Sequence, residues 1–507
     1  MNFKSILTFT SSLLLALTLL VSCSDDDNGS SDANPPSLTA PESSANPNLI
    51  IGDSADLTFN VNVPGGYASS SVEATNGTAS ITSEPSVGST SGTVVVNFSA
   101  NSSGAATITL TVTDEDGLSD DATTAVSITE EASEVLVSAN ITSDTTWETG
   151  KTYILGGRIA VEAGATLTIQ GGVIVKGEAG TGANSTALLV ARDATLNANG
   201  TADAPIIFTS VADEITPDDV ASGNFGSPNL DPDIQGLWGG VIVLGNAPIS
   251  ASTSPTQIEG IPTSDTNGLY GGDDPEDSSG SITYISIRHG GSNIGEGNEI
   301  NGLTLGGVGT GTVVENVEIV ANQDDGVEWF GGTVNVTNVL VWNNGDDGLD
   351  TDQAWAGSVT NSVLVNPEGS LFELDGPEGS YTSTGHTISN VTAYSGPDTG
   401  AFLIDTDDNT DVFVDNVLFL WAEGSSTILD DNYEEYADNT EGYEITNIEA
   451  ILPSGSALTD LFPQALIDSA PVTSVNSIGE ATVGADVSVF GWTWASQSGA
   501  LAELGLE

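Results

Sequence analysis

Two short acidic stretches place carboxylates at spacings that could support chemistry. They read NQDDGVEWFGG, from Asn322 to Gly332, and NNGDDGLDTD, from Asn343 to Asp352. Each sets two adjacent aspartates before a glycine and adds a further acid two residues after that glycine. The adjacent aspartates are Asp324, Asp325, Asp346 and Asp347. Clustered carboxylates bind hard cations, transfer protons and cleave glycosidic bonds, so these stretches are the first candidates for a functional site.

A repeating anchor indicates how these acids are arranged. The triplet Val/Ile-x-Asn recurs five times, at steps of 22, 23, 29 and 26 residues. Its asparagines are Asn316, Asn338, Asn361, Asn390 and Asn416. Glu328, Asp350 and Glu373 stand twelve residues after the first three asparagines, and Asp352 and Asp375 stand two residues beyond the second and third acids. Alternation along a strand sends the intervening apolar residues inward and the acids outward, so we predict columns of stacked carboxylates.

Such columns cannot remain fully ionised without compensation. Neighbouring coils of a stacked fold lie ~4.8 Å apart, and two carboxylates at that distance repel by roughly 3–4 kcal/mol at an effective dielectric of about 20. Bound cations, shared protons or splaying into water each relieve this repulsion. Ca²⁺ prefers about six to eight oxygen ligands, so we predict Ca²⁺ as the cofactor. The predicted metal ligands are Asp324, Asp325, Glu328, Asp346, Asp347, Asp350, Asp352, Glu373 and Asp375.

Two alternatives to a metal site stay open. Asp-Gly pairs form good turns, and the outward acids then belong to a generally acidic surface. Alternatively, glycoside hydrolysis needs two carboxyl groups about 5–9.5 Å apart, one of them with a raised pKa, and stacked acids offer such pairs. The candidate catalytic carboxylates are Asp325, Asp347, Asp350 and Glu373.

Basic and aromatic residues supply the remaining candidates for ligand contacts. Arg288 and His289 end the stretch ITYISIRHGG near the acidic repeats, where they could clamp an anion or simply pair with one of many acids. Trp355, in the turn QAWAGS, could stack on a sugar ring beside the acids or plug the end of a strand. The predicted ligand-binding residues are therefore Trp355, Arg288 and His289.

The elements that carry these residues are short strands. From Val135 onward the chain alternates β-rich runs with Gly and Asn and shows almost no helical periodicity. A period of 22 to 29 residues, built from two or three strands, is one coil of a parallel β-solenoid in which stacked asparagines bond from coil to coil. The segments 212–235 and 260–279 interrupt the repeat and are predicted insertions.

The fold class predicted for the whole chain is all-β. Residues 37–133 alternate as an immunoglobulin-like β-sandwich does, and residues 134–450 form the predicted parallel β-helix. Residues 451–507 include a short helical stretch and the strand-like VFGWTWAS, and we predict that they cap the open end of the β-helix.

The repeats resemble the right-handed parallel β-helix of the pectin-lyase-like superfamily, over roughly residues 135–450. Stretches such as GLWGGVIVLGNAPI also resemble a family of Bacteroidota surface lipoproteins, which implies location and fold and no activity. Polygalacturonases of the superfamily carry an Asp-Asp pair, a Gly-His-Gly motif and an Arg-x-Lys motif. Here the adjacent aspartates match the first, Gly385–Thr387 half-matches the second, and the third has no counterpart. If the chain is an enzyme, the resemblance implies a glycoside hydrolase rather than a lyase.

The N-terminus indicates export and lipid anchoring. An apolar run from Ile6 to Val21 follows Lys4, as in a signal peptide over residues 1–22. It ends in Leu-Val-Ser before Cys23, which resembles the lipobox of bacterial lipoproteins and implies acylation of Cys23. Residues 23–36 form an acidic tether that cannot bury apolar surface, and its SDDD resembles the export signal of Bacteroidota lipoproteins. We predict anchoring in the outer membrane, on the extracellular side.

The net charge limits the classes of ligand that the protein can bind. Six Lys and Arg face 71 Asp and Glu, a formal net charge of −65 that repels nucleic acid and leaves acidic polysaccharide dependent on bridging cations. We therefore predict a cell-surface lipoprotein that binds an extracellular ligand, a glycan by preference, with Ca²⁺ in the acidic columns. The alternatives are a polygalacturonase-like hydrolase and a scaffold or adhesin of an outer-membrane protein assembly.

Overall fold

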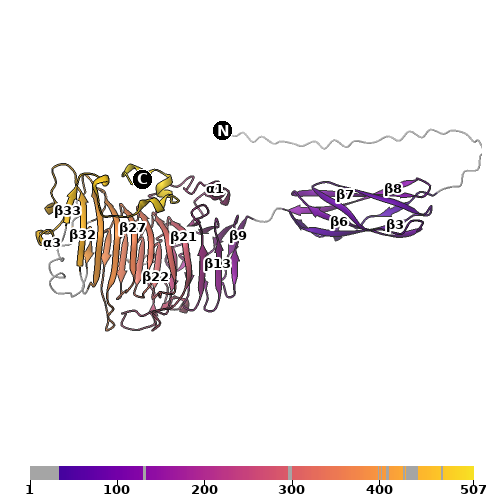
Figure 1. Ribbon diagram of the computed structural model, residues 1–507. Coiled ribbons are helices and arrows are strands. Elements are labelled where there is room, and N and C mark those ends of the chain that lie inside the picture. Colours follow the sequence, from indigo (N-terminus) through magenta and orange to yellow (C-terminus); the bar gives the residue numbers. More distant parts are fainter. Residues whose placement is uncertain are drawn as a thin grey trace, which may run out of the picture. The chain divides into compact units, whose positions relative to one another are not determined.

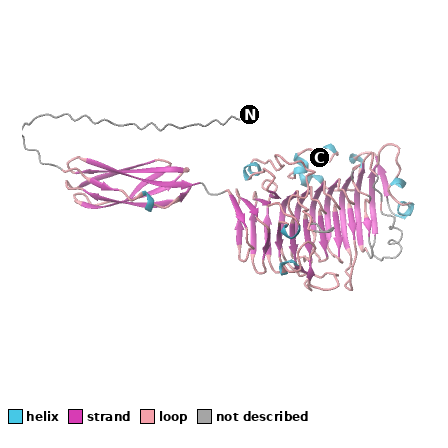
Figure 2. Ribbon diagram, turned by 180° about the vertical axis from the view of Figure 1, so that it is seen from behind, coloured by secondary structure: helices cyan, strands magenta, loops and turns pink. Residues whose placement is uncertain are grey.

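The computed structural model describes residues 34–129, 133–294, 300–397, 399–400, 402–406, 410–425, 429, 444–469 and 472–506. The predicted signal peptide, Cys23 and most of the tether lie outside these residues. The chain divides into two compact units, residues 1–131 and 132–507, and strands dominate both (Figures 1 and 2). The predicted all-β class is confirmed. Within the described ranges, no helix has the length and apolar character needed to cross a membrane.

The first unit is a sandwich of two four-stranded sheets, as predicted. Their strand orders are β1-β3-β6-β5 and β2-β8-β7-β4. The elements are β1 Ser37–Thr39, η1 Ser43–Ala45, β2 Leu49–Ile50, β3 Ser54–Asn62, β4 Tyr67–Ala74, β5 Gly77–Ser83, β6 Ser91–Ala100, β7 Gly104–Asp114 and β8 Ser119–Thr129. Alternate residues of both sheets meet in one core, in which Phe59, Phe98, Ile108 and Leu110 are fully buried.

The second unit is a right-handed parallel β-helix, as predicted. Its long sheet contains β9 Glu134–Val137, β11 Thr152–Leu155, β14 Ile174–Gly177, β17 Ile206–Ser210, β21 Gly280–Arg288, β23 Val313–Val320, β25 Val336–Trp342, β27 Ser358–Val365, β29 His386–Ser395, β31 Val412–Trp421, β32 Glu444–Ile451 and β33 Val472–Val475. β10 Thr145–Trp147, β13 Thr166–Gln170 and β16 Thr195–Asn199 join this sheet beside its first strands. Its neighbours pair in parallel, so each coil lies directly on the previous one.

A second parallel sheet forms another face of the coils. It contains β12 Arg158–Val161, β15 Ala187–Val190, β18 Val241–Leu244, β22 Leu303–Gly306, β24 Val327–Phe330, β26 Leu349–Asp352, β28 Phe372–Leu374 and β30 Asp405–Thr406. Inward residues of both sheets fill one continuous core, which includes Leu303, Val327, Leu349 and Phe372 at one position of four successive coils.

Asparagines bend the long strands at the same point of each coil. Asn316, Asn338, Asn361, Asn390 and Asn416 have φ values between 58° and 66°, in the left-handed region that Asn tolerates better than most residues. The side-chain amide of Asn338 donates to Asn316 over 2.9 Å, and that of Asn361 donates to Asn338 over 2.7 Å. Asn416 donates to Asn390 over 3.2 Å. These bonds confirm the predicted asparagine ladder.

Two insertions interrupt the coils of the β-helix. The first contains α1 Pro217–Ala221, and the second follows β18 and contains β19 Thr256–Gln257, η3 Thr266–Gly268 and β20 Leu269–Tyr270. A further short helical turn, η2 Gly182–Asn184, precedes β15. Ile249, Ile258 and Tyr270 of the second insertion are buried against outward apolar residues of the second sheet. The Tyr270 hydroxyl also donates to Gln353 over 3.0 Å, so this insertion reaches the residue that follows β26.

The C-terminal tail lies along the side of the β-helix. After η4 Leu458–Asp460, α3 Gln464–Ser469 and β33, the chain forms η5 Ile478–Glu480, η6 Val487–Phe490, α4 Trp494–Gln497 and α5 Ala500–Glu503. Phe490 and Trp494 pack on outward residues of β23 and β25, so residues 476–506 cover a lateral face, whereas the sequence predicts a cap on the open end. The strand predicted for VFGWTWAS is wrong because Thr493 accepts the backbone N–H of Ser496 at 3.1 Å and begins a helix.

Candidate functional site

Strand register brings the predicted acids together on the outer face of the second sheet. Glu328 of β24 lies opposite Asp350 of β26, Asp350 lies opposite Glu373 of β28, and Glu373 lies opposite Asp405 of β30. Thr304 of β22 occupies the same position one coil earlier. The column predicted from the asparagine spacing is therefore present and continues over four coils.

The same outward positions change character along the β-helix. In the early coils this column holds Ala160, Leu189 and Ile242, which the second insertion covers. The neighbouring column runs from Phe330 to Asp352, again one coil apart. Asp375, one residue beyond β28, follows Asp352 in that column. The outer face of the second sheet thus passes from an apolar, covered part to an acidic part.

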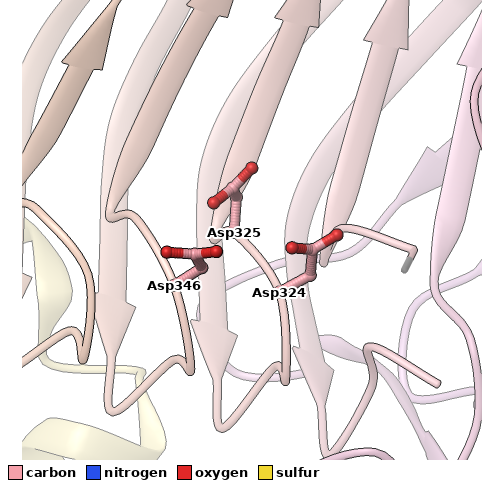
Figure 3. A group of neighbouring side chains, drawn as sticks. All are labelled: Asp324, Asp325 and Asp346. Atoms are coloured by element: carbon pink, nitrogen blue, oxygen red, sulfur yellow. The ribbon is translucent and has the colours of Figure 1, made fainter. Parts of the chain in front are cut away.

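The adjacent aspartates stack at the turn that precedes each of these strands. The backbone N–H of Asp347 donates to Oδ1 of Asp325 over 2.9 Å, and the N–H of Ser370 in turn donates to Oδ1 of Asp347. Figure 3 shows Asp324, Asp325 and Asp346 gathered on neighbouring turns. Each of these three offers an oxygen within 4.8 Å of the other two. A second column of carboxylates therefore runs beside the strand column.

Buried asparagines hold these turns in shape. The side-chain amide of Asn322 donates to the carbonyl oxygen of Asp325 over 2.9 Å, and that of Asn344 donates to the carbonyl oxygen of Asp347. Both asparagines are almost completely buried. Each side chain closes its own Asp-Asp-Gly turn, which fixes the direction in which the carboxylates project.

Asn301 completes the cluster and is the residue that sequence reasoning missed. It occupies the position of Asp325 one coil earlier, because Gly302 donates its N–H to the carbonyl oxygen of Asp325 over 3.0 Å. Its amide nitrogen donates to a carboxylate oxygen of Glu328. Asn301 is 4 % exposed, and its Oδ1 has no hydrogen-bond partner among the described residues. A buried amide oxygen next to carboxylates matches the donor set of a hard-cation site.

Burial and mutual repulsion favour protonation of these acids in the absence of a cation. Burial first, and the Glu328 carboxylate second, raises the pKa of Asp325 well above its usual range. The pKa values of Glu328 and Asp350 are raised well above normal, again mainly by burial. Burial and a hydrogen bond with Glu373 raise the pKa of Asp347 to about 8. The hydrogen bond with Asp347 lowers the pKa of Glu373, but burial and neighbouring carboxylates raise it on balance.

Exposure of the acids is uneven. Asp325, Glu328 and Asp347 are 7 %, 5 % and 6 % exposed, whereas Asp350 and Glu373 are half-buried. The sequence predicts the outward direction of the strand acids but not the burial of Asp325, Glu328 and Asp347. Glu259 of the second insertion lies near enough to Glu328 to contribute to the rise in the pKa of that residue. The half-buried Asp350 and Glu373 are the more accessible members of the cluster.

Arg288 and His289 lie in the long sheet and do not join the acidic columns. Arg288 is 1 % exposed and pairs with Glu318 over 3.5 Å, while the ring of Trp494 stands 4.9 Å from its guanidinium carbon. His289 is fully buried, and its Nδ1 lies 2.6 Å from the carbonyl oxygen of Ile234. The C-terminal tail covers both side chains. Arg288 therefore forms an internal salt bridge, and neither Arg288 nor His289 is a candidate ligand contact.

Trp355 is also absent from the outer surface. It is 1 % exposed, stacks on Trp329 with ring centroids 4.7 Å apart, and donates its indole N–H to Val334 over 3.1 Å. His386, the residue of the half-matched Gly-His-Gly motif, lies inside as well, 5.1 Å from the Trp355 ring, and burial lowers its pKa to about 3. The sugar-stacking role predicted for Trp355 is therefore wrong, and its side chain packs inside the coils instead.

Comparisons with known proteins identify the fold family. No curated protein matches the chain. Among solved structures it is similar to the family 28 exopolygalacturonase of Yersinia enterocolitica, with 11% identity, coverage of 84% of this chain and 88% of that chain, and a TM-score of 0.19. It is also similar to the catalytic unit of a GH87 α-1,3-glucanase of Streptomyces thermodiastaticus strain HF3-3, with 12% identity, 86% and 95% coverage and a TM-score of 0.19. These two likenesses concern the fold alone.

The family model for the pectate-lyase like beta helix domain matches residues 139–395, half of the chain. The matched region includes the asparagine ladder as far as Asn390, the second sheet from β12 to β28 and the carboxylates from Asp324 to Asp375. The chain belongs to the pectate-lyase-like β-helix family.

Proposed function

We propose that this protein is a lipid-anchored surface protein whose β-helix binds an extracellular glycan, with Ca²⁺ held in the acidic columns. One observation carries the proposal. Asp325, Glu328 and Asp350 each offer an oxygen within 4.8 Å of the other two, next to the buried, unpartnered Oδ1 of Asn301. Three carboxylates and this amide supply up to seven oxygens, within the roughly six to eight that Ca²⁺ takes.

Charge balance supports a cation more strongly than protons alone. In the described part of the chain, the Lys and Arg ion pairs involve Glu148, Asp265 and Glu318, none of which belongs to the columns. Protons can bind to the pairs Glu328–Asp350 and Asp347–Glu373 only at a pH below the raised pKa values, and one proton in each pair still leaves that pair with a charge of −1. A divalent cation neutralises two carboxylates at any pH at which they ionise.

A glycan fits the exposed edge of this site. Asp350 and Glu373 are half-buried and accept hydrogen bonds from sugar hydroxyls, while Ca²⁺ would also bridge an anionic sugar to an otherwise repelling surface. Membership of a pectate-lyase-like family supports a polysaccharide as the ligand class.

Thermal unfolding tests the cation directly. The EDTA-treated protein is titrated with Ca²⁺ and, in parallel, with Mg²⁺ while its melting temperature is followed. Saturation at ~100 times the dissociation constant adds about 2.7 kcal/mol to the stability of the folded state, so Ca²⁺ should raise the melting temperature clearly and Mg²⁺ much less. An unchanged midpoint in Ca²⁺ removes the metal from the proposal.

The anchor is tested separately. Expression in a lipoprotein-processing bacterium with labelled palmitate should label the wild-type protein and leave the Cys23→Ser variant unlabelled in the soluble fraction. Absence of palmitate label from the wild-type protein would contradict the lipid anchor and would leave the proposed cation site unaffected.

Glycoside hydrolysis is the second candidate, and the raised pKa of the half-buried Asp350 favours it, because a general acid must hold its proton near neutral pH. Reducing-sugar release from a panel of plant and algal polysaccharides separates the two functions. Turnover that Asp350→Asn abolishes, with binding intact, would place hydrolysis first.

A further inference from the structure

A cavity of about 480 Å³ lies where the C-terminal tail meets the last long strands. β29, β31 and β32 supply one wall, and η5, α5 and the residue after α5 supply the other. Its apolar lining includes Tyr394, Trp421, Ile451 and Leu504. The volume falls within the roughly 300–1,000 Å³ of small-molecule sites. This cavity belongs to the long sheet, and the acidic columns belong to the second sheet.

Three polar groups line the same cavity without protein partners. In the described ranges, the Tyr394 hydroxyl, the Ser477 hydroxyl and the Glu503 carboxylate make no side-chain hydrogen bond or salt bridge. Ser477 and Glu503 are exposed, and Tyr394 is half-buried. A mainly apolar cavity with two aromatic rings and a few unengaged hydrogen-bonding groups has the composition of a ligand site.

We propose that this cavity binds a neutral sugar residue of a glycan chain. The C–H faces of a pyranose ring pack on aromatic side chains, while its hydroxyls must find hydrogen-bond partners as they leave water. Tyr394 and Trp421 supply the rings, and Glu503 accepts hydrogen bonds from hydroxyls.

Charge selects a neutral sugar over an acidic one. Among the described residues that line the cavity none is basic, and Glu503 together with the net charge of −65 repels a uronate. A purely apolar occupant is disfavoured because it offers no hydrogen-bond partner to the half-buried Tyr394 hydroxyl. The site is therefore distinct in position and in ligand charge from the Ca²⁺-dependent columns.

Binding is tested in EDTA, so that the acidic columns cannot contribute through a cation. The probes are cellohexaose, mannohexaose, xylohexaose, laminarihexaose and maltohexaose, with hexagalacturonate as the anionic comparison. Intrinsic tryptophan fluorescence and calorimetry follow each titration of the full chain up to millimolar sugar. At least one neutral hexasaccharide should bind, and hexagalacturonate should not.

Matched variants locate the site. Tyr394→Ala and Glu503→Gln should each weaken binding about tenfold, a loss of one aromatic contact or one charged acceptor. Tyr381→Ala and Glu444→Gln remove an exposed tyrosine and an exposed glutamate outside the cavity and should leave affinity unchanged. Melting temperatures confirm that all four variants fold.

Two outcomes overturn the inference. Either no neutral hexasaccharide binds, or binding persists undiminished in both cavity variants. Hexagalacturonate binding equal to that of the neutral sugars would contradict the assigned charge class. Because Ca²⁺ is excluded throughout, these results are independent of whether the acidic columns bind metal.

Discussion

Glu328 and Asp350 lie opposite one another on adjacent parallel strands, and each places a carboxylate oxygen within 4.8 Å of the other. Burial first, and the Glu328 carboxylate second, raises the pKa of Asp350 well above its usual range, so without a cation this pair favours a bound proton. The pair is therefore a site where a proton and a divalent cation compete, and the consequences of that competition can be measured.

Stability without metal should fall as pH rises. The pKa of Asp347 is about 8 in the folded state against 3.8 for the same carboxyl in an unfolded chain, so the folded state binds more protons between these values and loses stability as pH rises through them. His386, whose pKa falls to about 3, acts with opposite sign only below 6.5. In EDTA the melting temperature should therefore drop by several degrees from pH 6.5 to about 8.5, and saturating Ca²⁺ should abolish the drop. A flat profile in EDTA would contradict the shared protons.

Neutral isosteres should uncouple stability from calcium. Glu328→Gln with Asp350→Asn removes two carboxylates of the cluster, including the Glu328 carboxylate that raises the pKa of Asp350. In EDTA at pH 8 the double variant should unfold at a higher temperature than the wild type, and Ca²⁺ should no longer raise that temperature. Glu315→Gln with Asp121→Asn changes two exposed acids elsewhere and should behave as the wild type in both conditions. If the Glu328→Gln, Asp350→Asn variant keeps the full Ca²⁺ response, the cation binds at another site.

The asparagine ladder should contribute measurably to stability. Asn338 donates to Asn316 and accepts from Asn361, and its φ of 61° is unfavourable for alanine. Each of the two lost hydrogen bonds costs about 0.5–1.5 kcal/mol and the left-handed conformation about 1–2 kcal/mol, so Asn338→Ala should lose about 2–5 kcal/mol in urea unfolding. Asn338→Gly, which keeps the backbone conformation, should lose less. Equal losses would mean that the backbone contributes nothing here.

The tail should be held mainly by Trp494. Its ring is 6 % exposed and covers Arg288 at 4.9 Å. Trp494→Ala should cost about 3–5 kcal/mol and expose the amides of residues 476–506 to hydrogen exchange, whereas Trp494→Phe should retain most of the packing. Unchanged exchange in the tail of the alanine variant would show that other contacts suffice.

The columns could be predicted because they depend on local rules. A fixed repeat places equivalent residues on neighbouring coils, and strand alternation decides which of them face outward, so Glu328, Asp350 and Glu373 follow from the asparagine spacing. The same alignment identifies Asn301, since NGLTLGG (residues 301–307) aligns with DGVEWFG (residues 325–331). That coil lacks a Val/Ile-x-Asn anchor, which is why counting from the anchors missed it.

The burial of side chains could not be predicted from the repeat, because segments that are distant in sequence cover the faces of the β-helix. Arg288 is sealed by a tail whose Ala495 donates its N–H to Glu318, 177 residues away in sequence. Trp355 turns inward because Gln353 and Ala354 both adopt φ values near 57° and break the alternation of the strand. Neither the long-range contact nor the two left-handed residues leave a periodic pattern in the sequence.

Calorimetric titration of Ca²⁺ into the EDTA-treated protein at pH 7, repeated in buffers of different ionisation enthalpy, tests the central claim most directly. A cation that displaces the protons shared by Glu328, Asp350 and their neighbours must release protons as it binds, so the apparent heat should depend on the buffer, and both the heat and the proton release should vanish in the Glu328→Gln, Asp350→Asn variant. Absence of binding heat in the wild type, or identical heats in the wild type and that variant, would contradict a Ca²⁺ site in the acidic columns.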